Sequence, residues 1–312
     1  MYYEAKANRS LLYESGLSEN GKVYMTVNVE ELAYQALLRT ALDNGREVDD
    51  RTGVGCRSLF GSSLRFDLRD GFPLMTTRFI SFRIAFEEMM FFLRGESNTK
   101  KLEDKDINIW KGNTSREFLD SRGLEYLEEG DIGKGYGWQI RNFGGTWSRE
   151  GFDQLAYLVE NIKSNPADRR HYMNYWHPEQ VLEEAAIPPC HLSYNCQVAG
   201  HRLNACFYMR SCDLYHGAPY NIAGYAFLTH LIARLTGYEP GELVMFVADA
   251  HIYNNQLEVI EKQLARVPYE FPEFEFKKDF SSLEEALSLE WKDVAISKYS
   301  HCGRLAKVEM AV

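Results

Sequence analysis

The sequence has neither a surplus of basic residues nor a long apolar run. Its 35 Lys and Arg residues are outnumbered by 45 Asp and Glu residues, and the formal net charge is -10. Because binding to nucleic acids needs clustered positive charge against phosphate, we expect no nucleic-acid partner. No stretch approaches the roughly 18 apolar residues of a membrane span, and residues 1–22 lack the apolar core of a signal peptide. We therefore expect no membrane partner and a cytoplasmic protein, in the host cytoplasm if the source is viral.

Cysteine is also sparse, with six residues in a chain of 312. This number is too small for a disulfide scaffold and indicates a reducing compartment. The chain has no Cys-x-x-Cys pair. Cys190 and His191 are adjacent, and neighbouring side chains of a strand point to opposite faces, so the two cannot easily share one metal ion. We expect no metal site.

The chain divides into a short polar segment and one large domain. Residues 1–28 are polar and irregular, so we interpret them as an N-terminal extension. Residues 29–312 are expected to form a single domain, because 45% of the chain is hydrophobic and a chain of this length can bury a substantial core.

Hydrophobic periodicity predicts the main elements of this domain. Apolar residues at helical spacing predict four helices, within residues 29–45, 82–95, 152–165 and 221–237. Alternating patterns predict two short strands within 55–77, a hairpin that turns at 199–201, and a strand within 239–256. Helices and strands mix without regular alternation. The pattern therefore favours an α+β fold with a mixed β-sheet.

Cys190 follows two prolines in "IPPCHLSYNCQV", residues 187–198, and opens a strand-like pattern. A thiol held in this way could be a nucleophile, a metal ligand or part of the core, and a buried inert thiol is the commonest fate of a cysteine. A neighbouring arginine would favour the thiolate, which is the nucleophilic form. The residues alone leave these alternatives open.

Other polar residues stand where their chemistry needs a partner. Glu88 lies in an apolar helical segment, where a carboxylate is costly unless it is paired. Arginine can hold a phosphate with two hydrogen bonds, although a single surface arginine is more often part of an ion pair. Four arginines occur in loop-like or strand-end positions: Arg51, Arg169, Arg170 and Arg210. They predict an anion site if the fold brings them together.

Many motifs of the chain, in their order and rough spacing, resemble the thymidylate synthase family. They include "RTGVG", "EEMMFFLRGESN", "GDIGKGYGWQIRNFGG", "DRR", "PPCH", "MRSCDLYHGAPYNIAGYAFL", "DAHIYNNQ" and the final "MAV". The resemblance covers residues 30–312. It implies an α+β catalytic domain that forms a homodimer through its sheet, with deoxyuridylate (dUMP) as substrate, 5,10-methylenetetrahydrofolate as co-substrate and no metal.

The resemblance implies a role for each matching residue. Cys190 would add to C6 of the uracil ring, with Arg210 favouring its thiolate. The phosphate would contact Arg51, Arg210 and Ser211 of one chain and Arg169 and Arg170 of the other. The deoxyribose hydroxyl would contact His251 and Tyr253, the folate would contact Trp110, Asp213 and Val312, and Glu88 and Tyr136 would handle protons.

Asn221 matches the residue that reads the base. Its amide would accept from N3–H and donate to O4 of uracil, whereas the relatives that use cytidylate carry Asp at this position. An asparagine near a helix start is also a good N-cap, and the residue alone favours that reading.

Several departures from the synthase pattern bear on the product. A 5-methylene intermediate that takes hydride from the folate gives thymidylate, and one that takes water gives 5-hydroxymethyl-dUMP. The sequence resembles the pyrimidine nucleotide hydroxymethylases at Trp138, Met209 after Tyr208, and His177 before Pro178, and it also departs from the synthases at Ile140 and Lys111. The final "MAV" is the synthase tail that closes over the folate. The departures surround the pocket that must stay dry for hydride transfer, and water exclusion decides between the two products. We therefore expect a dUMP hydroxymethylase, with thymidylate synthase as the alternative and an inactive nucleotide-binding relative as a more distant one.

Overall fold

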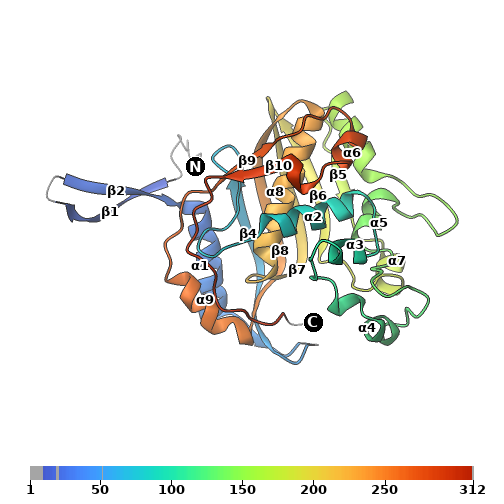
Figure 1. Cartoon of the computed structure of the whole chain (residues 1–312), viewed down its shortest axis with the longest axis horizontal. Helices are drawn as coiled ribbons and strands as arrows, with labels where there is room; N and C mark the ends of the chain where they lie inside the picture. Colours follow the sequence, from blue (N-terminus) through green and yellow to red (C-terminus); the bar gives the residue numbers. More distant parts are fainter. Residues whose placement is uncertain (1–9, 19–20, 51, 311–312) are drawn as a thin grey trace.

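A six-stranded mixed β-sheet forms the centre of the molecule (Figure 1). The computed structural model describes residues 10–18, 21–50 and 52–310, with side chains from residue 28 onward. The strand order is β3-β4-β8-β7-β6-β5, and β7 and β8 are parallel while the other neighbours are antiparallel. The bounds are Arg46–Val48 (β3), Cys56–Asp67 (β4), Tyr172–Asn174 (β5), His191–Ala199 (β6), Arg202–Asp213 (β7) and Glu239–Tyr253 (β8). The predicted α+β fold with a mixed sheet is confirmed.

The helices of the described chain and a small second sheet surround this centre. The four longest are α1 (Val29–Asn44), α2 (Phe82–Leu93), α6 (Gln154–Ser164) and α8 (Gly217–Thr236). The shorter ones are α3 (Lys100–Glu103), α4 (Arg116–Ser121), α5 (Tyr136–Arg141), α7 (Pro178–Glu183), α9 (Leu257–Leu264) and α10 (Leu283–Leu287), with 3-10 turns at Gly112–Thr114, Asn254–Gln256 and Trp291–Asp293. Strands β9 (Glu273–Phe276) and β10 (Val294–Ser297) pair with each other. None of the described helices is long and apolar enough to cross a membrane.

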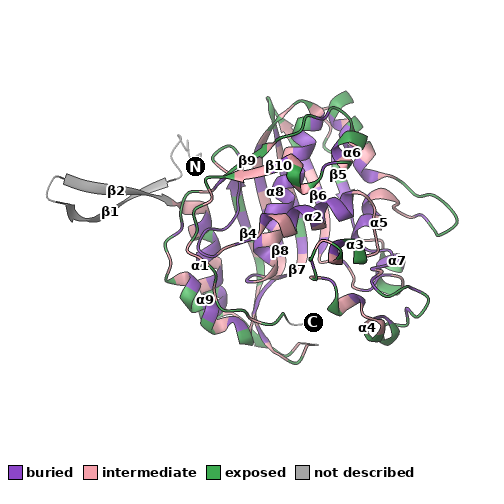
Figure 2. Ribbon diagram, viewed as in Figure 1, coloured by how far each residue is buried: buried purple, intermediate pink, exposed green. Residues whose placement is uncertain are grey.

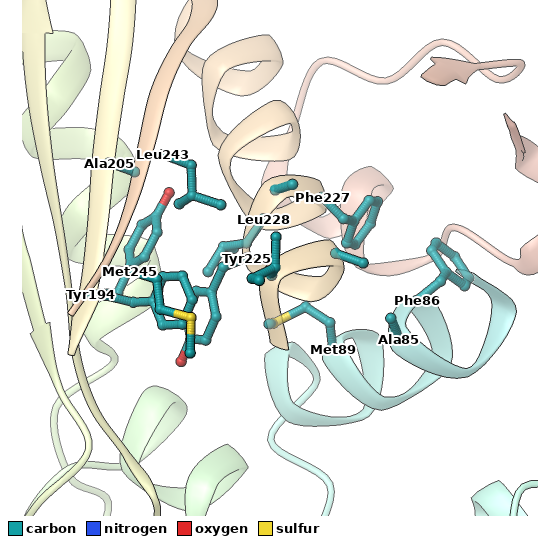
Figure 3. Close-up of a cluster of buried hydrophobic side chains, with 14 of the residues drawn as sticks. Ala85, Phe86, Met89, Tyr194, Ala205, Tyr225, Phe227, Leu228, Leu243 and Met245 are labelled. Atoms are coloured by element: carbon teal, nitrogen blue, oxygen red, sulfur yellow. The ribbon is translucent and has the colours of Figure 1, made fainter. Parts of the chain in front are cut away.

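Helix α8 lies between the sheet and α2 and carries the core (Figure 3). Its sequence is apolar on all sides, which is typical of a helix buried on every face. The ring of Tyr225 stacks on Phe207 of β7 at 4.1 Å, and Phe227 meets Phe86 of α2 at 5.0 Å. The helix ends at Gly237, whose φ of 78° is readily adopted by glycine. Each such buried side chain stabilises the fold by about 1.5–3 kcal/mol.

The opposite face of the sheet is partly open to solvent. Tyr208 of β7 and Phe246 of β8 are register partners and are 39% and 43% exposed. Cys206 and Val244 are the next pair on the same face, and both are half-buried. This surface contrasts with the buried interior of α8 and α2 (Figure 2).

Two sequence predictions are wrong. Residues 10–18 and 21–28 are not irregular, because β1 (Ser10–Ser18) and β2 (Gly21–Asn28) pair as antiparallel strands. The sequence of β2 is rich in β-branched and aromatic residues, which are enriched in strands. The two short strands predicted within 55–77 are one 12-residue strand, β4, which continues through Gly61 at a φ of 81°.

Candidate active site

Cys190 lies directly before β6, in a bend that Arg210 of β7 holds. The Arg210 side chain donates from Nε to the carbonyl of Pro189 and from Nη2 to the carbonyl of Pro188, both over 2.9 Å. The backbone N–H of Arg210 donates to the Cys190 carbonyl over 3.0 Å. These bonds place Nη2 3.8 Å from the Cys190 sulfur. A cation at this distance favours the thiolate over the thiol.

Tyr136, the first residue of α5, contacts the same cysteine. The backbone N–H of Cys190 donates to the Tyr136 hydroxyl over 2.9 Å. The Tyr136 ring stacks on Phe92 of α2 at 4.6 Å and meets Trp110 edge-on at 5.6 Å. Burial raises the pKa of the Tyr136 hydroxyl well above its ordinary value, so the group keeps its proton and can donate it in a hydrogen bond.

Glu88 has the partner that its apolar surroundings demand. The indole N–H of Trp110 donates to the Glu88 carboxylate over 2.9 Å. Burial raises the pKa of Glu88 to about 7, although the hydrogen bond from Trp110 opposes the rise. Both protonation states are therefore populated near neutral pH, which suits a group that gives or takes a proton.

Asn221 and His191 form a polar pair beside Tyr136. The Asn221 Nδ2 lies 2.9 Å from His191 Nε2, and the His191 ring meets Tyr136 edge-on at 5.3 Å. Burial lowers the pKa of His191 to about 3, so the ring is neutral. Asn221 lies one turn inside α8, whose N-cap residue is His216. The N-cap interpretation of Asn221 is therefore wrong.

A second group of residues lies where β7 and β8 end side by side. Ser211 pairs in register with Asp249, and Asp213 pairs with His251. His251 is buried, and its ring lies 5.1 Å from that of Tyr253. Because Arg210 and Asp213 are only three residues apart on β7, this group continues the Cys190 cluster at the carboxyl-terminal ends of β7 and β8.

Arg169 and Arg170 do not join this cluster in the described chain. Arg169 and Arg170 are exposed in the loop between α6 and β5, and in the described chain Arg170 pairs with Asp168 over 2.9 Å. Arg51 and Val312 lie outside the described residues. Within those residues, no group of three or more His, Cys, Asp or Glu side chains could hold a metal ion.

The residues that depart from the synthase pattern take different positions. Met209 is buried and pairs in register with His191, and Ile140 is buried in α5. His177 precedes α7, and its ring lies 5.4 Å from Phe143. Trp138 packs on the exposed Trp147 at 4.7 Å and Lys111 is exposed. Of these, Met209 is next to the Cys190 cluster through His191.

Two residues of the site were missed in the sequence. His191 positions Asn221, and its place directly after Cys190 in a proline-stiffened turn was the available signal. Gln256 is fully buried and donates to Asp213 over 2.7 Å. Gln256 is the last residue of the motif "DAHIYNNQ", but no role was assigned to it, because its partner Asp213 is 43 residues away along the chain.

Comparison with known proteins identifies the family of this chain. The family model described as thymidylate synthase matches residues 32–312. The chain belongs to the thymidylate synthase family. It is 44% identical over 299 residues to a bifunctional dihydrofolate reductase-thymidylate synthase of Leishmania amazonensis, covering 93% of this chain and 56% of that protein. It is 44% identical over 263 residues to the thymidylate synthase of human herpesvirus 8 type P (isolate GK18), covering 82% and 78%.

A third relative, a probable thymidylate synthase of Schizosaccharomyces pombe, is 42% identical over 301 residues, which is 91% of this chain and 48% of that protein. The chain therefore spans about half the length of the Leishmania amazonensis and Schizosaccharomyces pombe relatives. The relatives carry the name thymidylate synthase, and none of these names supports the hydroxymethylase subtype expected from the sequence.

Proposed function

We propose that this chain is a thymidylate synthase, which makes thymidylate from dUMP and 5,10-methylenetetrahydrofolate. The single observation that carries the proposal is the Cys190 thiol beside Arg210, in a family whose named relatives are thymidylate synthases. The activity is assigned to one catalytic domain, residues 29–312, which the N-terminal segment precedes.

Cys190 is the nucleophile of the proposed reaction. Its thiolate forms a bond to C6 of the uracil ring, and the electrons of the C5–C6 double bond move to O4 as an enolate. Arg210 supports the thiolate, and protonated Glu88 supplies the proton that O4 takes up. Addition to C6 makes C5 nucleophilic.

Asn221 reads the uracil ring. Its Oδ1 accepts from N3–H and one Nδ2 hydrogen goes to O4, while the other Nδ2 hydrogen is held by His191. We assign the His191 proton to Nδ1, so that Nε2 accepts from the amide and fixes which end of the amide is the donor. Cytosine presents an acceptor and an amino group at these positions, and an amide held in this orientation matches them poorly.

Carbon transfer and reduction complete the proposed cycle. C5 bonds to the methylene carbon of the folate as one of its carbon–nitrogen bonds breaks. C5 then loses its proton to a water molecule that the Tyr136 hydroxyl holds by a hydrogen bond. Departure of tetrahydrofolate leaves a 5-methylene group on the nucleotide. Hydride from tetrahydrofolate converts this group to methyl, yields dihydrofolate, and releases the Cys190 thiolate.

The phosphate and sugar contacts are proposed at the same ends of β7 and β8. The hydrogen bonds of Arg210 within the described chain use Nε and Nη2, which leaves Nη1 for a phosphate oxygen. Ser211 is next to it on β7, and His251 with Tyr253 takes the deoxyribose hydroxyl. Arg51 is assigned to the phosphate, Trp110 and Asp213 to the folate, and Val312 to closure over the folate.

The exposed position of Arg169 and Arg170 supports a homodimer in which each chain completes the phosphate site of the other. The open sheet face around Tyr208 and Phe246 is the surface proposed for this contact, because two aromatic rings at 39% and 43% exposure stand side by side on it. Association through this face would bury the two rings and leave the Cys190 cluster accessible.

The dUMP hydroxymethylase is the second candidate. The observation that favours it is Met209, which is buried in register with His191 beside the cluster and matches the hydroxymethylase pattern. In that reaction water, rather than hydride, adds to the 5-methylene group, and tetrahydrofolate leaves unoxidised.

An absorbance assay separates the two functions. Hydride transfer oxidises the folate to dihydrofolate and raises absorbance near about 340 nm, because the signal belongs to the oxidised co-substrate. We expect this rise to depend on dUMP and to match the amount of nucleotide consumed. Consumption of dUMP without the rise would favour the hydroxymethylase, and no consumption of dUMP would contradict both.

A further inference from the structure

Lys134 is a buried lysine outside the group of residues assigned to the substrates. Its Nζ lies 2.8 and 2.7 Å from the two carboxylate oxygens of Glu184. The same ammonium group lies 5.4 Å from the ring centre of Trp138 and 5.3 Å from that of Trp147, a range in which aromatic rings attract cations. A buried ammonium group is costly unless it is paired, and here a carboxylate and two indole rings compensate it.

The backbone around Lys134 joins two segments of the chain. The Lys134 N–H donates to the Glu184 carbonyl over 2.8 Å. The Ala186 N–H donates to the Ile132 carbonyl over 3.0 Å. Between these bonds, Gly133 has a φ of 67°, and a Cβ added there would lie 2.1 Å from the Glu184 carbonyl oxygen, so the approach requires glycine. The ion pair of Lys134 with Glu184 therefore spans a junction at which the two backbones already meet.

Both segments lead directly into the proposed active site. Lys134 is two residues before Tyr136. Glu184 is six residues before Cys190, whose N–H donates to the Tyr136 hydroxyl over 2.9 Å. Arg210 holds the far end of the second segment through two carbonyl groups. The segment that leads to the nucleophile is thus fixed by Lys134 at its start and by Arg210 at its end.

The loop of residues 142–152 covers this junction. Isolated β-bridges close the loop on itself. The Gly145 carbonyl accepts from the Gln180 side chain over 2.6 Å, which ties the loop to α7. Trp147, near the tip of the loop, is 56% exposed and also contacts the buried ammonium group of Lys134. The loop therefore places an indole ring between solvent and the ion pair, and exclusion of water strengthens the attraction between the two charges.

We propose that Lys134 is a positioning residue, whose ion pair with Glu184 sets the place of the Cys190 thiol. Without this pair the segment keeps its Arg210 anchor and moves more freely at its start. A displacement of about 1 Å at a reacting atom can cost about a hundredfold in rate. The inference rests on the proposed function, in which Cys190 is the nucleophile, and it places Trp138 beside Lys134 rather than in the choice between hydride and water.

Lys134→Met tests the ion pair, because methionine is also long and unbranched and carries no charge. We expect kcat to fall about ten- to a hundredfold while the Kd for dUMP changes less than about threefold, because the arginines assigned to the phosphate keep their places. Lys163→Met is the matched control, since it removes an exposed ion pair with Glu160 over 3.5 Å on α6 and should change neither value by more than about twofold. An unchanged kcat in Lys134→Met would overturn the inference.

A double-mutant cycle separates the ion pair from its two side chains. Glu184→Gln leaves the Lys134 ammonium group buried without its counter-charge, whereas Lys134→Met/Glu184→Gln removes both charges. The double variant should therefore be no slower than Glu184→Gln. Losses in kcat that multiply in the double variant would show that the two residues act independently and would overturn the inference. Thermal melting verifies that each variant is folded.

The two indole rings can be tested separately. Trp147→Leu changes an exposed position and remains informative if Lys134→Met does not fold; we expect kcat to fall about threefold or more as water reaches the ion pair. Trp138→Leu should lower kcat in the same way and keep the parent's ratio of thymidylate to 5-hydroxymethyl-dUMP. A kcat equal to that of the parent in both variants, or a changed product ratio in Trp138→Leu, would contradict the roles given to these rings.

Hydrogen exchange tests the inference without the reaction. The Cys190 N–H should exchange at least about tenfold faster in Lys134→Met than in the parent, because its bond to the Tyr136 hydroxyl is held less firmly, and Lys163→Met should leave it unchanged. Equal exchange in Lys134→Met and the parent would overturn the inference, whatever the activity. A parent that does not consume dUMP, with the exchange result as expected, would contradict the proposed function alone.

Discussion

The indole N–H of Trp110 donates to the Glu88 carboxylate over 2.9 Å and partners a carboxyl group that stands in the most apolar part of α2. This bond stabilises the charged form, and burial stabilises the neutral form more strongly, so the pKa of Glu88 is raised to about 7. At neutral pH, Glu88 can therefore supply the proton that O4 of the uracil ring is proposed to take up.

The pH dependence of the reaction should follow this carboxyl group. Since Glu88 must be protonated to give a proton to O4 of the uracil ring, kcat/KM for dUMP at saturating folate is expected to fall as the pH rises through about 7. Glu88→Gln should lose this fall and be at least about a hundredfold slower at pH 6. In Trp110→Phe the carboxylate loses its donor, so the fall should move to higher pH. An unchanged inflection in Glu88→Gln would assign it to another group.

The nucleophile can be tested against a cysteine of the same strand. Cys190→Ala should lower turnover by at least about a thousandfold, or ~4 kcal/mol of transition-state stabilisation, and leave dUMP binding largely intact. Cys196→Ala is the control, because burial raises the pKa of Cys196 to about 12 and makes it an inert core thiol. Activity of Cys190→Ala within tenfold of the parent would exclude the thioether route.

Subunit mixing tests whether the arginines serve the other chain. Arg170→Ala and Cys190→Ala homodimers should each be inactive. After subunit exchange, a mixed dimer has one site with both residues intact, and a random mixture should regain about a quarter of the parent activity. Exchange can be followed with differently labelled chains. If exchange occurs and activity does not return, Arg170 acts within its own chain or not at all.

Base selection should depend on Asn221. Asn221→Asp is expected to weaken dUMP by about 1–3 kcal/mol in kcat/KM and to improve deoxycytidylate, because a carboxyl group can pair with the ring nitrogen and amino group of cytosine. Competition between the two nucleotides measures this preference directly. A variant that prefers uracil as strongly as the parent would leave Asn221 with only its structural bond to His191.

The sequence predicted those features that depend on local pattern. Apolar residues on all sides of α8 indicated a buried helix, and the carboxylate of Glu88 among apolar neighbours indicated a partner. Two prolines before Cys190 indicated a stiff turn, although nothing local showed that Arg210 holds their carbonyls. That clamp exists because β6 and β7 pair in a register that brings Arg210 to Cys190.

Features that depend on distant pairing could not be predicted. Gln256 is 43 residues from Asp213 along the chain, and only the parallel pairing of β7 with β8 brings the strand ends together. The alternative interpretation of Asn221 as an N-cap failed for a similar reason: the start of α8 at Gly217 is set by the turn after β7, not by an asparagine. The hairpin of β1 and β2 was missed because the whole N-terminal segment was judged by its polarity, and the β-branched and aromatic residues of β2 were not weighed.

The product formed in oxygen-18 water tests the central claim most directly. Mass spectrometry after reaction of dUMP with 5,10-methylenetetrahydrofolate should show thymidylate without oxygen-18, together with an equal amount of dihydrofolate, because hydride rather than water reaches the 5-methylene group. A 5-hydroxymethyl nucleotide that carries one oxygen-18, with the folate recovered as tetrahydrofolate, would contradict the account and establish the hydroxymethylase.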